Sequence, residues 1–117
     1  MPRILIVDDD RTTVKLLQTL LEMDGFQVVT AVNGQVALHA ADNTPPDVFL
    51  VDYHLSDMDG IELVGHLRSD SRFAQTPIVM ASGLDKGDEA LAAGVNAFLI
   101  KPFEPDKLAD LFTDLLG

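Results

Sequence analysis

Residues able to do chemistry follow the apolar segments of the chain. Three carboxylates come directly after the apolar run at residues 3–7, and three later runs end in a carboxylate, a hydroxyl and an ammonium group. In chain order these residues are Asp8, Asp9, Asp10, Asp52, Ser82 and Lys101. Carboxylates gathered at one place resist ionising together, and a hard divalent cation removes that conflict. Mg²⁺ favours a few carboxylates together with waters and a phosphate oxygen.

The lysine and the serine extend this chemistry to phosphoryl groups. Lys101 supplies a positive charge and Ser82 a hydrogen-bond donor, and both groups can hold phosphoryl oxygens. An aspartate carboxylate can act as a nucleophile and form a covalent intermediate. The set therefore predicts Mg²⁺-assisted phosphoryl transfer to an aspartate.

Five short apolar segments alternate with five segments of helical periodicity. Strands are expected at residues 3–7, 27–31, 48–52, 77–82 and 97–101, and helices around 14–21, 36–41, 61–67, 89–93 and 105–116. This alternation predicts an α/β fold, a doubly wound (βα)5 domain with a central five-stranded parallel sheet. We expect one domain over residues 1–117. Ligands bind such sheets at the carboxyl ends of the strands, where the candidate residues would meet.

Composition excludes several classes of function. The chain of 117 residues has no cysteine, so it has neither a thiolate nucleophile nor a disulfide framework. A formal net charge of −11 argues against binding to nucleic acid or to an anionic membrane. No apolar run reaches the ~20 residues of a membrane span, and no secretory signal precedes the first strand. We expect a cytoplasmic domain.

The chain resembles the receiver domain of two-component response regulators, which has a flavodoxin-like fold. The matching motifs cover the whole chain and are Val7-Asp8-Asp9, Asp52 with Gly60 downstream, Ser82-Gly83, and Lys101-Pro102-Phe103. The resemblance implies that Asp52 accepts a phosphoryl group from a phosphohistidine on a sensor histidine kinase or a histidine phosphotransfer protein. It also implies a downstream effector protein or fused domain, and a signalling role without enzymatic turnover of a separate substrate.

The same resemblance assigns the remaining site residues. Asp8, Asp9, Asp52 and the backbone carbonyl of His54 would hold Mg²⁺. Ser82 and Lys101 would contact the phosphoryl group. Phe98 would be the switch aromatic that follows Ser82, and the Lys101–Pro102 bond would be cis, which X–Pro bonds allow.

Three departures from the family pattern stand out. Leu55-Ser56 occupies the place where the family often has Met-Pro, and Phe98 lacks the hydroxyl of the common tyrosine. The interval from Ser82 to Lys101 is a few residues shorter than usual. We therefore expect a shortened fourth helix or a shortened loop before it.

Simpler interpretations and two other functions remain open. Asp10 is expected to cap the first helix, and the side chains of His39, His54 and His66 are expected at the surface. The segment from Asp8 to Thr12 also spells the D-x-D-x-T nucleophile motif of haloacid-dehalogenase-like phosphohydrolases, which would leave Asp52 without a role. A third possibility is a pseudo-receiver that uses the fold only for protein contacts.

Overall fold

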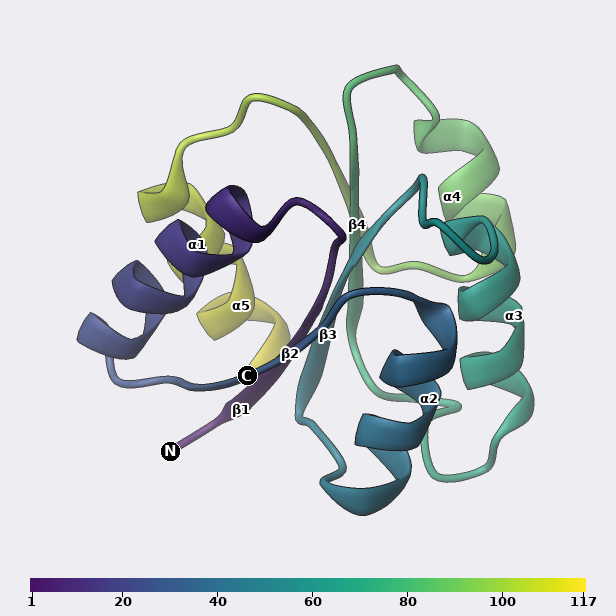
Figure 1. Cartoon of the computed structure of the whole chain (residues 1–117), viewed down its shortest axis with the longest axis horizontal. Coiled ribbons are helices and arrows are strands. Elements are labelled where there is room, and N and C mark those ends of the chain that lie inside the picture. Colours follow the sequence, from purple (N-terminus) through teal and green to yellow (C-terminus); the bar gives the residue numbers. More distant parts are fainter.

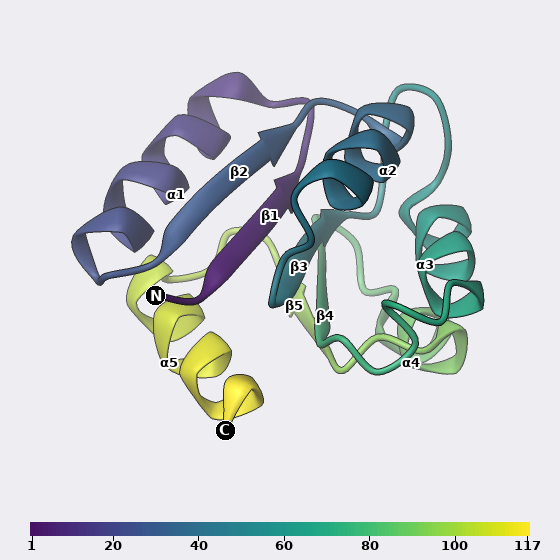
Figure 2. The ribbon, with the colours of Figure 1, turned by 90° about the horizontal axis from the view of Figure 1, so that it is seen from below.

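A five-stranded parallel sheet lies between two layers of helices in the computed structural model, which describes all 117 residues (Figures 1 and 2). The strands are β1 (Arg3–Val7), β2 (Gln27–Ala31), β3 (Val48–Asp52), β4 (Ile78–Ser82) and β5 (Ala97–Ile100). The helices are α1 (Arg11–Met23), α2 (Gly34–Asn43), α3 (Gly60–Ser69), α4 (Gly87–Ala93) and α5 (Pro105–Leu116). The predicted fold class and all ten elements are confirmed.

The strand order is β2-β1-β3-β4-β5, and every neighbouring pair is parallel. Helices α1 and α5 cover one face of the sheet, and α2, α3 and α4 cover the other (Figure 2). The strand order reverses at β1, which lies between β2 and β3. Ligands of open parallel sheets bind beside such a reversal, at the carboxyl ends of the strands.

The central strands are apolar between their end residues because both faces are covered. In β1, Leu5 and Val7 belong to the core on the α2, α3 and α4 side, whereas Ile4 and Ile6 belong to the core on the α1 and α5 side. Side chains alternate across a strand, so a strand buried on both sides needs an unbroken apolar run. The edge strand β5 has no fully buried residue.

The ends of the helices follow local capping chemistry. The Asp10 carboxylate accepts hydrogen bonds from the N–H groups of Thr12 and Thr13 at the start of α1. Gly94 ends α4 with a φ of +109°, a left-handed conformation that glycine adopts without a steric cost. Helix α4 has seven residues, and the other helices have ten to thirteen. The short α4 is consistent with the expectation that the fourth helix, or the loop before it, is shortened.

The loop from β3 to α3 returns closely against the end of β3. Gly60 donates its N–H to the carbonyl of Tyr53 at 2.6 Å. A methyl carbon added at Gly60 would lie 2.5 Å from the backbone oxygen of Asp52, far inside van der Waals contact. Glycine at this position therefore permits the loop to pack beside the strand end.

We predict that Gly60→Ala lowers the free energy of unfolding by about 2 kcal/mol, because backbone must shift to admit the methyl group. Gly65→Ala, in the same helix but with no atom within 4 Å of the added carbon, should raise it by up to about 1 kcal/mol. Urea unfolding of the two variants measures both effects. Equal stability of the two variants would contradict the close packing at Gly60.

Candidate functional site

Three carboxylates converge at the carboxyl ends of β1 and β3. Asp8 and Asp9 follow β1, and Asp52 is the last residue of β3. Each offers an oxygen, and these oxygens all lie within 4.8 Å of one another. Asp8 is buried, Asp52 is half-buried and Asp9 is exposed. The parallel strands bring together residues that are separated by more than forty positions in the sequence.

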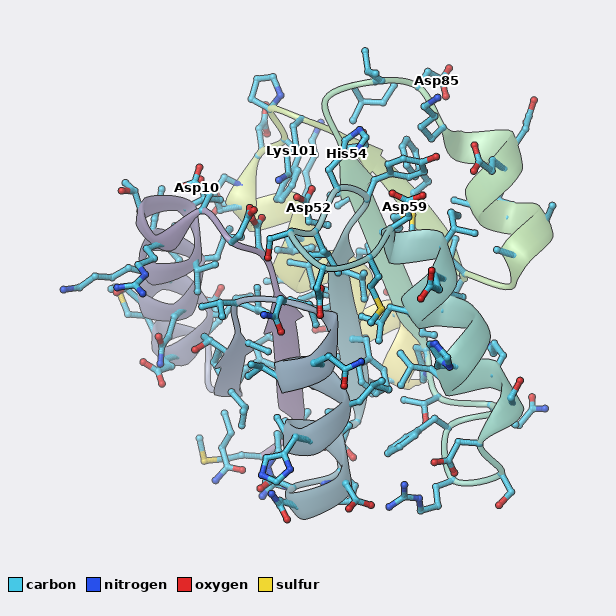
Figure 3. The ribbon with its side chains drawn as sticks, turned by 45° about the vertical axis from the view of Figure 1, so that its right-hand side comes forward. Asp10, Asp52, His54, Asp59, Asp85 and Lys101 are labelled. Atoms are coloured by element: carbon cyan, nitrogen blue, oxygen red, sulfur yellow. The ribbon has the colours of Figure 1, made fainter.

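Lys101 joins two of these carboxylates. Its Nζ donates to Oδ2 of Asp8 and to Oδ1 of Asp52, each at 3.0 Å. Lys101 follows β5, and the Lys101–Pro102 peptide bond is cis, as the resemblance implies. In Figure 3 the labelled side chains of Asp52 and Lys101 lie close together at the upper edge of the sheet. One ammonium group thus compensates two carboxylates, and Asp9 has no such partner.

Burial and charge oppose each other at this cluster. Burial raises the pKa of Asp52, the hydrogen bond from Lys101 offsets part of that rise, and the charges of Asp8 and Asp9 add to it. Burial alone would lower the pKa of Lys101, but its hydrogen bonds to Asp8 and Asp52 outweigh burial and raise it. Lys101 is therefore charged at neutral pH, and additional positive charge at the cluster would favour ionised Asp52.

The remaining acidic residue of the first loop serves the helix. The Asp10 side chain is exposed and caps α1, and a hydrogen bond from Thr13 lowers its pKa. Its backbone N–H donates to Oδ1 of Asp8 at 2.9 Å, which holds the Asp8 carboxylate in place. The expected role of Asp10 as a cap is confirmed, and Asp10 contributes to the site only through this backbone contact.

Three other candidates lie around the cluster. Ser82 ends β4 with its side chain buried, and its Oγ accepts a hydrogen bond from the N–H of Leu84 at 3.1 Å. His54 follows the end of β3 with its side chain exposed, and Figure 3 shows it at the same edge of the sheet as Asp52 and Lys101. Phe98 in β5 is half-buried and packs against the core on the α2, α3 and α4 side.

Comparison with known proteins identifies the family. The family model described as the response regulator receiver domain matches residues 4–113. The chain is a response regulator receiver domain. It therefore belongs to two-component signalling, and nothing in the fold or in the comparisons supports the phosphohydrolase or the pseudo-receiver alternative. None of its five helices has the length and apolar character needed to cross a membrane.

Relatives of this receiver domain differ in length. The chemotaxis protein CheY1 of Helicobacter pylori is 35% identical over 98% of this chain and 97% of its own length. The regulatory protein AtoC of Escherichia coli is 37% identical over 91% of this chain, but the match spans only 23% of AtoC. The solved structure of CheY4 of Vibrio cholerae superposes with a TM-score of 0.92, 31% identity and 98% coverage of each chain.

Two contacts made after the end of β3 have no signature in the sequence. Both carboxylate oxygens of Asp57 accept backbone N–H groups at 2.9 Å, from Gly34 and Gln35 at the start of α2. These hydrogen bonds lower the pKa of Asp57. The hydroxyl of Tyr53 donates to Glu89 in α4, also at 2.9 Å. Each contact joins residues more than twenty positions apart, so local patterns could not predict them.

Proposed function

We propose that this receiver domain, residues 1–117, accepts a phosphoryl group on Asp52 from a phosphohistidine donor. The donor would be a sensor histidine kinase or a histidine phosphotransfer protein in the cytoplasm. The observation that carries the proposal is the Asp52 carboxylate at the end of β3. It lies beside Asp8 and Asp9, and it accepts a hydrogen bond from Lys101.

In the proposed step, a carboxylate oxygen of Asp52 forms a bond to phosphorus as the bond from phosphorus to the donor imidazole nitrogen breaks. The product is an aspartyl phosphate, and the electron pair returns to the imidazole. The Lys101 ammonium, already at the carboxylate, would hold a phosphoryl oxygen. The Ser82 hydroxyl accepts from Leu84 and so keeps its own hydrogen available for a second phosphoryl oxygen.

The donor set at the strand ends fits Mg²⁺. Asp8, Asp9 and Asp52 offer carboxylate oxygens, which are the hard ligands that this ion prefers. We propose that the backbone carbonyl of His54 adds a further oxygen ligand. When bound, the ion supplies the positive charge that Lys101 cannot provide for all three carboxylates. The exposure of Asp9 leaves that side of the cluster open to an ion from solvent.

The proposal includes a switched surface and an output partner. We propose that Ser82 and Phe98 pass the state of Asp52 to the surface formed by α4 and β5, where an effector protein or a fused domain would bind. The CheY1 relative has nearly the length of this chain, whereas AtoC is about four times longer. Both a stand-alone regulator and a longer fused regulator therefore fit the proposal.

Mapping the modified residue tests the phosphoryl transfer directly. Acetyl phosphate, a small phosphoryl donor, is incubated with the protein and Mg²⁺, and the acyl phosphate is reduced with borohydride to mark its position. We expect one group per chain, on the peptide that contains Asp52, and none after chelation of Mg²⁺. Modification at Asp8, which the phosphohydrolase alternative requires, would overturn the proposal.

A metal titration gives an independent prediction. A ligand that binds only the folded state stabilises it by about 1.4 kcal/mol at ten times its Kd. For this length, Mg²⁺ should raise the melting midpoint by about 5 °C. Asp9→Ala should remove most of this response, and in chelator it should melt above the wild type because one uncompensated carboxylate is gone. Asp59→Ala, an exposed acidic residue without a side-chain cap contact, should keep the response.

Thermal unfolding with Mg²⁺ or with chelator measures these effects. An Asp9→Ala variant that melts below the wild type in chelator would show that Asp9 is a structural group. It would then not be part of a repulsive metal site.

A further inference from the structure

Helix α4 is held firmly at its C-terminal end. The guanidinium of Arg68, at the end of α3, donates to the carbonyl of Gly94 at 2.9 Å. The same group reaches the carbonyls of Phe73 and Thr76 at 2.8 and 2.7 Å and Oδ1 of Asn96 at 2.9 Å. Arg68 therefore ties the end of α4 to the loop before β4 and to the start of β5. Hydrogen bonds from one charged donor to several acceptors hold this end in place.

The N-terminal end of α4 is held differently. Its capping residue, Lys86, makes no side-chain hydrogen bond to the helix. Instead, two side chains of this end contact Tyr53: Glu89 accepts from the Tyr53 hydroxyl at 2.9 Å, and the Lys86 Nζ lies 5.6 Å from the centre of the Tyr53 ring. Tyr53 is buried, whereas Glu89 is exposed. One aromatic side chain under the helix thus makes both polar contacts.

Tyr53 directly follows Asp52, and its backbone is part of the site. Its N–H donates to the carbonyl of Ala81 at 2.9 Å, and its carbonyl accepts from Gly60 at 2.6 Å. Gly60 packs against the backbone of both Asp52 and Tyr53. Tyr53 is bonded directly to Asp52, so a shift of the strand end at Asp52 would be passed to Tyr53 without an intervening residue.

Phe98 cannot supply the polar contact that Tyr53 makes. The Phe98 ring approaches the start of α4, where a carbon added at Gly87 would lie 3.6 Å from it, but phenylalanine has no hydroxyl. Tyr53, which follows the central strand β3, instead donates a side-chain hydrogen bond directly to Glu89 in α4. The contact joins the residue after the proposed phosphoacceptor to the helix of the proposed output surface.

We propose that Tyr53 is a positioning residue that holds the N-terminal end of α4 and transmits the state of Asp52 to it through the Tyr53–Glu89 hydrogen bond. The inference rests on the proposed function, because Asp52 must change state for α4 to respond. The helix would pivot about the end that Arg68 holds. The contact with Lys86 adds a cation–π attraction to the same ring.

Two variants and a matched control test the contact in the protein without a phosphoryl group. Tyr53→Phe removes only the hydroxyl, and Glu89→Ala removes its acceptor. Asp88→Ala is the control, because it removes one negative charge from the same turn of α4 as Glu89→Ala does. We expect amide hydrogen exchange in α4 to quicken about fivefold in the first two variants and to stay unchanged in the control. Equal exchange in all three variants, or faster exchange across β1 and β3 as well, would overturn the proposal.

Beryllofluoride with Mg²⁺, which mimics a phosphoryl group on a carboxylate, tests the transmission. In the wild type, amide NMR shifts should change around Asp9, Asp52 and α4. Tyr53→Phe should keep the changes at Asp9 and Asp52 and lose more than half of those in α4, which a purely structural role would not produce. Undiminished changes in α4 would overturn the proposal. A wild type without changes at Asp52 would contradict the proposed function instead, while the exchange measurement would still decide whether the contact holds α4.

Discussion

Asp52→Asn should carry less than about one-hundredth of the wild-type label after incubation with acetyl phosphate and Mg²⁺. The amide keeps the shape of the carboxylate and an oxygen that can accept the hydrogen bond from Lys101. It lacks the anionic oxygen that attacks phosphorus, so the bond to the phosphoryl group cannot form. The variant should therefore stay folded and lose only the chemistry.

Intact-mass spectrometry measures the label, and Asp59→Asn provides the matched control. Asp59 lies seven residues after Asp52, at the end of the loop that follows β3. It is exposed and makes no side-chain cap contact with α3. It should be labelled like the wild type. Full labelling of Asp52→Asn would show that another carboxylate is the acceptor and would remove the basis of the proposed function.

Lys101→Met should lower the free energy of unfolding by about 2 kcal/mol in chelator. The substitution removes the ammonium group shared by Asp8 and Asp52, whose side chains are only 8% and 13% exposed. Breaking a fully buried ion pair costs about 3–5 kcal/mol, because a charge is left without a partner. We expect a smaller loss of stability here because the Lys101 side chain is 29% exposed, so the ion pair is not fully buried.

Mg²⁺ should restore part of the lost stability, so its stabilising effect should be larger in Lys101→Met than in the wild type. Lys107→Met is the control, because Lys107 is exposed and its Nζ lies 3.9 Å from Glu104 at the surface. That variant should change the free energy of unfolding by less than about 0.5 kcal/mol. Urea unfolding with and without Mg²⁺ compares the two variants. Identical curves would show that the bridge between the carboxylates contributes no stability.

The sequence by itself determined the elements and the candidate residues of this receiver domain. Buried parallel strands are continuous apolar runs, and the polarity changes sharply where each strand ends. Asp8, Asp52 and Ser82 were therefore found at strand ends, and the structure places them there. Capping is equally local, which is why the role of Asp10 followed from a short segment.

Only the tertiary structure decided which of these residues touch. Lys101 bridges Asp8 and Asp52, from which it is 93 and 49 positions away, because the strand order β2-β1-β3-β4-β5 brings their ends to one edge. Tertiary packing also decided the contact of Asp57 with the backbone at the start of α2 and the contact of Tyr53 with Glu89 in α4. A side-chain pattern reports the burial of its own segment, whereas a hydrogen bond across the sheet depends on how the segments pack.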